Sequence, residues 1–320
     1  GLPVDSYIEK GILEDLTPIL GSEKEKFLPN IVSVYSQEDK IYMLPLRVIV
    51  PLFMTSGQNQ EKYSDLESLV EYSEEEGGVA NIVGYSYENI LQILYYNYKP
   101  DLFLGNGMVD REATAKFFSL VRRFCKAEQI TETALGTTPY VHGYSTVAVL
   151  FAEGEKDLVF LAGNGVYSLA QYPASVKIRN GELVGNHGIF IPNGLLGVNR
   201  LSEKKEVANL FINFAFSYEI QNRHVARSGY PIHMKLLEEY AQMDLSYLSS
   251  YNGKISLRWY NAEESAQLVQ IVKEAHTPVT IEENIWEILL EVAENYLKDK
   301  KGLDESVDEF ASRLQLYLFE

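Results

Sequence analysis

Helix-like and strand-like stretches of this sequence occupy separate regions, and this separation limits the possible folds most strongly. Over residues 63–127 the apolar side chains recur at the three- and four-residue spacing of amphipathic helices, as at Phe117, Leu120, Val121 and Phe124. Strand-like runs follow at 147–151, 158–161, 188–191 and 195–198. Helices and strands that alternate by region predict an α/β fold.

Further helices are predicted after residue 200. Ser202 is a candidate cap for a helix running to Arg227, whose apolar stripe is Val207, Leu210, Phe211 and Phe214. A capping box at 280–283 and a cap at Asp304 predict two C-terminal helices that pack onto the globular body. The helical apolar residues are therefore expected to face the core.

Prolines interrupt the early part of the chain. Thr17-Pro18 predicts a turn. Residues 40–54 are rich in β-branched and aromatic residues, but Pro45 and Pro51 lack the N–H groups that a continuous central strand uses. We therefore expect two extended segments joined at a bend, with a change of domain near residue 50.

Length, charge and cysteine content exclude several classes of protein. The 320 residues fit about two domains. A net charge of −17 disfavours binding to nucleic acid or anionic lipid. The single cysteine, Cys125, excludes an intramolecular disulfide and any CxxC site. No apolar run is long enough to cross a membrane, and residues 1–6 do not resemble a signal peptide.

Catalytic and cofactor motifs are missing from the sequence. The segments 143–147 and 84–88 lack the second glycine of a nucleophile elbow, and those starting at Gly105 and Gly163 lack the third glycine of a dinucleotide fingerprint. The five histidines form no zinc-binding pattern. We expect no cofactor, no metal and no enzyme, although a pair of glycosidase carboxylates would leave no motif.

Tyrosine is the favoured aromatic residue, with 22 Tyr against 14 Phe and 2 Trp. A tyrosine ring offers an apolar face and a hydrogen-bonding hydroxyl, which suits contact with sugars. Each tyrosine taken singly, including those at 85, 87, 95, 96 and 98, is equally consistent with helix packing. This bias favours a saccharide ligand without locating its site.

Six segments, in order, resemble the carbohydrate branch of the extracellular solute-binding proteins of ABC importers, which includes maltose-binding protein. They are YIEKGILEDLTP at 7–18, DKIYMLP at 39–45, FLAGNGVY at 160–167, GLLGVN with SEKKEVANLFI at 194–212, YEIQ to GYP at 218–231, and LQLYLFE at 314–320. Glu38-Asp39 replaces the usual Asp-Gly, and Val166-Tyr167 departs from Ala-Met. The ending is similar to that of Gram-positive lipoprotein members.

The resemblance implies a type II periplasmic-binding-protein-like fold of two hinged lobes. Residues 1–48 plus 193–234 would form the first lobe, and 49–192 plus 235–320 the second. The first lobe would be incomplete at its N-terminus, which would leave sheet edges and apolar helix faces uncovered, so we expect either self-association or local disorder near residues 1–40. The implied role is capture of a mono- or oligosaccharide for an ABC permease, outside the cell, by a precursor anchored as a lipoprotein.

The implied binding residues lie around the boundary between lobes. Tyr172, directly after the 160–169 strand, is the first candidate stacking platform, and Trp259 is the second. Arg47 and Tyr230 are candidates beside the hinge, with a salt bridge and a turn tyrosine as their structural alternatives. Three tyrosines after glycine turns complete the set: Tyr85, Tyr87 and Tyr144. A glycan-degrading hydrolase, and a binder of peptides or metal chelates on the same scaffold, remain as alternatives.

Overall fold

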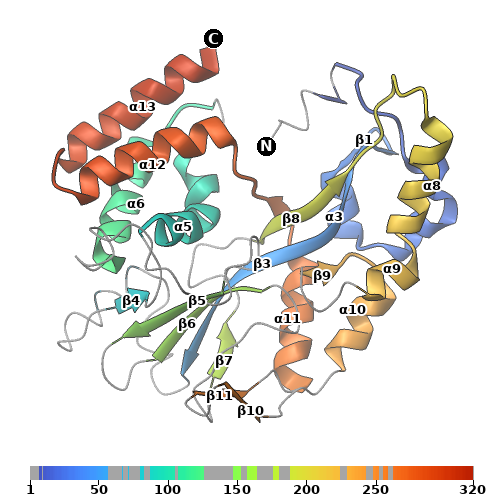
Figure 1. Cartoon of the computed structure of the whole chain (residues 1–320), viewed down its shortest axis with the longest axis horizontal. Helices are drawn as coiled ribbons and strands as arrows, with labels where there is room; N and C mark the ends of the chain where they lie inside the picture. The colour runs from blue at the N-terminus through green and yellow to red at the C-terminus, as the bar shows by residue number, and fades with distance from the viewer. Residues whose placement is uncertain are drawn as a thin grey trace.

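The computed structural model describes residues 7–8, 10–56, 67, 71, 80–82, 87–104, 107–125, 147–152, 157–163, 176–179, 188–223, 229–242, 248–251, 255–258 and 262–319. These residues form helices around a mixed sheet (Figure 1). The sheet runs in the order β12-β8-β3-β6-β5-β4, and β7 and β9 also pair with β3. An α/β fold is therefore confirmed.

The long strand β3 (Leu44–Ser56) runs through the centre of this sheet (Figure 1). One side of β3 pairs with β8 (Ile189–Leu196) over residues 44–49 and with β7 (Val176–Arg179) over 53–56. The other side pairs with β9 (Tyr230–Pro231) and then with β6 (Asp157–Gly163) over 50–55. The strand thus changes partners near residue 50.

The expectation of two segments joined at a bend is wrong for this stretch. Pro45 pairs with Leu195 of β8 and Pro51 with Ala162 of β6. At each proline, a single described strand pairs with β3, and the other edge of β3 has no described partner at that position. Its missing N–H can therefore face the side without a partner, and the strand continues.

The remaining strands are short. They are β1 (Ser36–Gln37) with β2 (Lys40–Ile41), β4 (Ala80–Ile82), β5 (Val147–Ala152), β10 (Leu248–Tyr251) with β11 (Ile255–Arg258), and β12 (Thr277–Pro278). The predicted strands at 147–151 and 158–161 are confirmed. The runs predicted at 188–191 and 195–198 are one strand, β8, because its ladder with β3 continues through Pro192.

Residues 7 and 8 are helical, and five helices of the first half have described bounds. They are α2 (Thr17–Leu20), the 3₁₀ helix η1 (Gly21–Lys26), α3 (Pro29–Val34), α5 (Tyr87–Leu102) and α6 (Arg111–Phe124). Thr17-Pro18 thus starts a helix and is not the predicted turn, since proline fits the first helical turn. The Asp15 carboxylate accepts a hydrogen bond from the Thr17 N–H at 2.8 Å.

The second half contributes α8 (Lys205–Ala215), α9 (Tyr218–Arg223), α10 (Met234–Ala241), α11 (Ala262–Glu274), α12 (Glu283–Leu297) and α13 (Leu303–Phe319). The helix predicted from Ser202 to Arg227 is therefore two helices, separated at Ser217. The predicted capping box before α12 does not form, because α12 begins at Glu283 without a side-chain cap.

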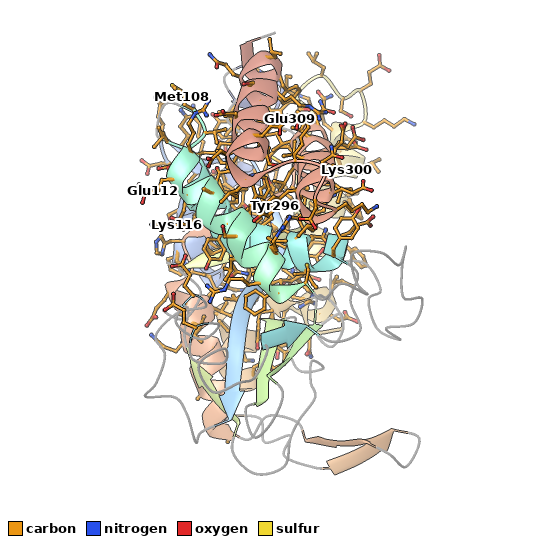
Figure 2. The ribbon with its side chains drawn as sticks, turned by 90° about the vertical axis from the view of Figure 1, so that its left-hand side faces the viewer. Met108, Glu112, Lys116, Tyr296, Lys300 and Glu309 are labelled. Atoms are coloured by element: carbon orange, nitrogen blue, oxygen red, sulfur yellow. The ribbon has the colours of Figure 1, made fainter. Side chains whose placement is uncertain are left out.

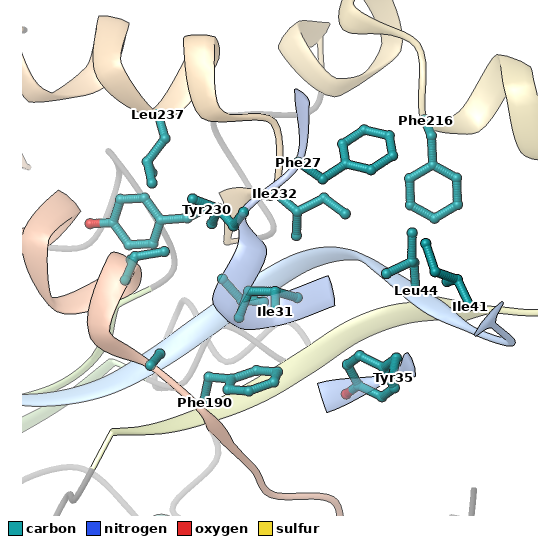
Figure 3. Close-up of a cluster of buried hydrophobic side chains, with 14 of the residues drawn as sticks. Phe27, Ile31, Tyr35, Ile41, Leu44, Phe190, Phe216, Tyr230, Ile232 and Leu237 are labelled. Atoms are coloured by element: carbon teal, nitrogen blue, oxygen red, sulfur yellow. The ribbon is translucent and has the colours of Figure 1, made fainter. Parts of the chain in front are cut away.

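Buried side chains form two large clusters. The first cluster joins α2, α3, the start of β3, α8, α10 and α11, and includes Phe27, Tyr35, Phe190 and Phe216 (Figure 3). The second cluster joins α5, α6, α12 and α13. Figure 2 shows Tyr296 between α6 and the C-terminal helices, where the Arg122 guanidinium lies 3.9 Å from its ring centroid.

Helices α10 and α11 pack with the first cluster, and the expected division of the lobes at residue 234 stays a prediction. Leu237 and Tyr240 of α10 and Val269 and Val272 of α11 are buried in the first cluster, together with residues 16–50. Helices α12 and α13 belong to the second. Along the chain, side-chain packing therefore changes from the first cluster to the second after Ala275.

Candidate functional site

Three segments of the chain lie side by side: β3, β8 and residues 275–283, the last of which lead from the first cluster to the second. A small third cluster, which we call the junction, lies where they pass and consists of Ile49, Tyr96, Ile189, Ile191 and Val279. Ile49 comes from the point where β3 changes partners. The junction is apolar and at most 9 % exposed, and it lies on the face of β3 and β8 opposite to the first cluster.

The third segment is fixed at both ends. On the first-cluster side, Asn30 Nδ2 donates to the carbonyls of Val272 (3.0 Å) and Ala275 (2.6 Å) at the end of α11. On the second-cluster side, Lys99 Nζ donates to the Thr280 carbonyl (2.6 Å) and to the Glu282 carboxylate (2.6 Å to Oε2). Only residues 276–279 lie between these two anchored ends.

Those few residues pair with the start of β8. The N–H groups of His276 and Thr277 donate to the Gly188 carbonyl at 2.7 and 3.0 Å, and that of Val279 donates to the Phe190 carbonyl at 2.8 Å. Gly188 has φ +76°, and a Cβ there would lie 2.3 Å from the His276 ring. Glycine at 188 therefore permits the close approach of the second and third segments.

Arg47, a predicted ligand contact, lies on β3 two residues before Ile49 and is buried. One Nη donates to the Gln221 carbonyl, and the Gln221 side-chain amide donates to the Leu46 carbonyl at 3.1 Å. No carboxylate in the described part of the chain forms an ion pair with Arg47. Burial lowers the pKa of Arg47 to about 10, so the group stays charged at neutral pH.

Tyr230, the second described candidate, forms β9 with Pro231 and pairs with Val48 of β3. Gly229 has φ +103°, and a Cβ at that position would lie 2.6 Å from the Val48 carbonyl oxygen. Only glycine lets the chain approach β3 so closely. The Tyr230 ring is 3 % exposed and packs in the first cluster (Figure 3).

Tyr87, the third described candidate, is the first residue of α5 and is buried in the second cluster. Burial, followed by the Glu294 and Glu88 carboxylates, raises the pKa of its hydroxyl to about 12. Tyr172, Trp259, Tyr85 and Tyr144 lie outside the described residues. The structure thus brings Arg47 and Tyr230 together around β3 and places Tyr87 in the other cluster, and the ligand roles of all seven stay predictions.

Sequence reasoning missed the residues of the junction. Tyr96 was one of five helix tyrosines without a distinctive pattern, yet it is the one that α5 contributes to the junction. Its neighbour Tyr95 is buried inside the second cluster, on another face of the same helix. One feature of the sequence points to the junction: Ile49 is an apolar residue between two prolines, Pro45 and Pro51. In the structure, β3 changes its partner strand at this residue.

The described residues include no group of three or more His, Cys, Asp or Glu side chains arranged to hold a metal ion. Among the described helices, none combines the length and apolar character needed to cross a membrane. No family model matches the sequence, and a search of curated proteins finds no match. The comparison that gives matches is the one with solved structures.

Solved solute-binding proteins resemble this chain over almost its whole length. A putative oligosaccharide periplasmic-binding protein from Synechococcus sp. MITs9220 matches with TM-score 0.60 and 16% identity, covering 97% of this chain and 81% of the other. A chitin oligosaccharide binding protein matches with TM-score 0.59 and 18% identity over 98% and 81%. Maltose-bound MalE3 of T. maritima matches with TM-score 0.54 and 17% identity over 96% and 81%.

Because the matches cover at least 96% of the chain, they include both packed clusters. At 14–18% identity, the agreement establishes the fold. The predicted resemblance to the carbohydrate-binding solute-binding proteins is confirmed at this level. The chain therefore has the type II periplasmic-binding-protein-like fold of the extracellular solute-binding proteins.

Proposed function

We propose that this chain is the substrate-binding component of an ABC importer, which captures a saccharide between two hinged lobes and delivers it to a membrane permease. The lobes would be built on the first and second clusters. The observation that carries the proposal is the presence of two separately packed cores, with residues 275–283 leading from one to the other past the junction. Such an arrangement suits closure around a ligand, because few residues absorb the rotation.

The fold neighbours support a saccharide as the ligand. Among them are proteins described as bound to maltose, to blood group A-trisaccharide and to laminaribiose. Tyrosine-rich composition favours the same class, because rings stack on the C–H faces of sugars. We assign the stacking role to Tyr172 and Trp259 and hydrogen-bond donation to Arg47. Supporting roles are proposed for Tyr230, Tyr85, Tyr87 and Tyr144.

The proposal includes a binding role without catalysis and a location outside the cell, with the precursor held by a lipid anchor. The neighbours are binding proteins of transport systems, and this supports a receptor in preference to an enzyme. A screen of thermal stability with sugars, short peptides and metal chelates tests the ligand class, since a specific ligand raises the melting temperature by mass action. Turnover of a chromogenic glycoside would instead indicate a hydrolase.

The proposed contacts are tested by titration calorimetry with the sugar that gives the largest stabilisation. Tyr172→Ala and Trp259→Ala should each weaken binding by about 10-fold or more, because loss of ring stacking costs on the order of 1.5 kcal/mol. Tyr317→Ala is the matched control, since Tyr317 is an exposed ring on α13 at 40 % exposure. Unchanged affinity in both folded variants would contradict the assignment.

A further inference from the structure

The segment between α11 and α12 (Figure 1) is hydrogen-bonded to the first cluster and to β8 as far as Val279. Asn30 of α3 binds the two carbonyls at the end of α11. Three N–H groups within residues 276–279 then donate to the carbonyls of residues 188 and 190, and the last of these donors is the N–H of Val279. Phe190, which accepts this last bond, is itself buried in the first cluster. The backbone therefore moves with the first cluster up to this N–H group.

A single lysine holds the chain immediately afterwards. Lys99 Nζ donates to the Thr280 carbonyl at 2.6 Å and to both carboxylate oxygens of Glu282, at 2.8 and 2.6 Å. Lys99 lies on α5 and Glu282 directly precedes α12, and both helices pack in the second cluster. The two side chains are 17 % and 26 % exposed, so salt screens this ion pair less than a surface pair. From the Thr280 carbonyl onward, the backbone is held by the second cluster.

Only the link from Val279 to Thr280, which we call the pivot, lies between these two sets of hydrogen bonds. Rotation about its backbone bonds leaves both sets intact, whereas rotation elsewhere in 272–282 distorts at least one of the bonds. On the preceding side, the ring of Pro278 fixes its own φ. The Val279 side chain is buried in the junction together with Ile49, where β3 changes partner strands.

From these contacts we infer that Lys99 is a positioning residue, which confines rotation between the two clusters to the pivot and sets their resting angle. Lys99 acts through the backbone that it holds, and we assign it no contact with a ligand. The inference rests on the proposed function, because the angle between lobes matters for capture only if the lobes close around a ligand.

The distance between two spin labels, one on each cluster, tests the inference without any ligand. Ser22→Cys on η1 and Ser312→Cys on α13 give exposed labelling sites in a Cys125→Ser background. The flanking residues of η1 pack in the first cluster and those of Ser312 in the second. Pulsed electron paramagnetic resonance should give one narrow distribution of distances for the chain without further substitutions.

Two threonines of this segment provide a matched pair of substitutions. Thr280→Gly should widen the distance distribution by about 1.5-fold or more, because glycine adds backbone freedom at the pivot. Thr277→Gly is the control: Thr277 is also half-buried, but its N–H is held by the Gly188 carbonyl at 3.0 Å. This second substitution should leave the width unchanged.

Substitution of the lysine tests its role directly. Lys99→Met should widen the distribution or shift its mean, and Lys99→Arg, which keeps the charge and the donors, should restore the wild-type distribution. Lys301→Met is the control, since Lys301 forms a partly buried ion pair with Glu309 at 2.7 Å inside the second cluster region. Its distribution should match that of the wild type. Circular dichroism melts verify that the variants are folded.

Two results would overturn the inference: an unchanged distribution in folded Lys99→Met, or equal widening by the two glycine substitutions. The thermal screen with sugars is a separate measurement. If no sugar stabilises the chain while the distances change as expected, the proposed function is wrong and the role of Lys99 at the pivot is retained.

Discussion

Helices α6 and α8 carry apolar stripes with identical spacing and have opposite environments. The α6 stripe, Phe117, Leu120, Val121 and Phe124, is at most 2 % exposed, because α5, α12 and α13 surround it. The equivalent stripe of α8 is more than half exposed. The comparison shows that helical periodicity defines which side chains lie on one face, whereas the elements that cover this face are set by the rest of the fold.

The largest expected effect is the difference between equivalent phenylalanines on the two helices. Phe117→Ala should lower the free energy of unfolding by about 3–5 kcal/mol, because it leaves a cavity in the second cluster. Phe211→Ala should change it by no more than about 0.5 kcal/mol, because the ring is already in water. Urea unfolding at low protein concentration measures both values. Similar losses for the two variants would show that α8 is covered in solution even when the chain is dilute.

A smaller effect is expected at the contact that joins α6 to α12. The Arg122 guanidinium stacks on the Tyr296 ring, donates to the Tyr296 carbonyl, and pairs with Asp299 at 2.7 Å. Arg122→Ala should lower the free energy of unfolding by about 1–2 kcal/mol, since it removes a cation–π contact and a bond to a helix-terminal carbonyl.

Lys116→Ala on the same helix is the control for Arg122. Lys116 is exposed, and its ion pair is with Glu112 one turn away (Figure 2). Surface pairs of this kind contribute little, so no measurable change is expected. If Arg122→Ala also unfolds at the wild-type urea concentration, the stacking on Tyr296 does not help to hold α6 in place.

Lowering the pH should reduce the stability of the first cluster, because a buried histidine lies there. His233 is buried in the first cluster region, between the rings of Phe27 and Tyr218. Burial, followed by the charge of Lys26, lowers its pKa, and Lys235 acts in the same direction; Glu23 and Glu239 oppose the shift. The unfolded chain therefore binds this proton more readily, and stability falls as pH decreases through the ordinary histidine range near ~6.5.

The measurement is urea unfolding at pH 7.5 and 5.5. His233→Gln should reduce the loss of stability between the two pH values, whereas His276→Gln, at an exposed position, should leave it unchanged. The buried polar residues of the second cluster, Asn97, Thr114 and Ser306, do not titrate. A pH dependence that persists in His233→Gln would place the sensitive group elsewhere.

Much of the secondary structure could be predicted from the sequence, because local periodicity reports it. The strands at 147–151 and 158–161 and the helix around Phe117 follow directly from spacing. The predictions that were wrong about secondary structure at residues 17–18 and 40–54 were those based on proline. Pro18 begins a helix, and Pro45 and Pro51 lie within β3, since the cost of a missing N–H depends on whether a partner strand is present on that side.

The candidate site could be predicted only in part. Arg47 was chosen for its position beside the first hinge strand, and it lies on β3 near the junction. Its contact with the Gln221 carbonyl, 174 residues away in sequence, follows from the pairing of distant segments and has no local signal. The same holds for Tyr96, which meets Ile49, Ile189 and Val279 only in the folded chain.

The sequence by itself determined the α/β character, the amphipathic helices and the resemblance that predicted the fold, because each of these depends on residue order and spacing within short segments. Only the tertiary structure decided that β3 is continuous, that α10 and α11 pack with the first cluster, and that the apolar stripe of α8 is more than half exposed. These outcomes depend on contacts between segments far apart in the chain. Whether an apolar stripe is buried depends on its neighbours in space, which a pattern along one helix does not specify.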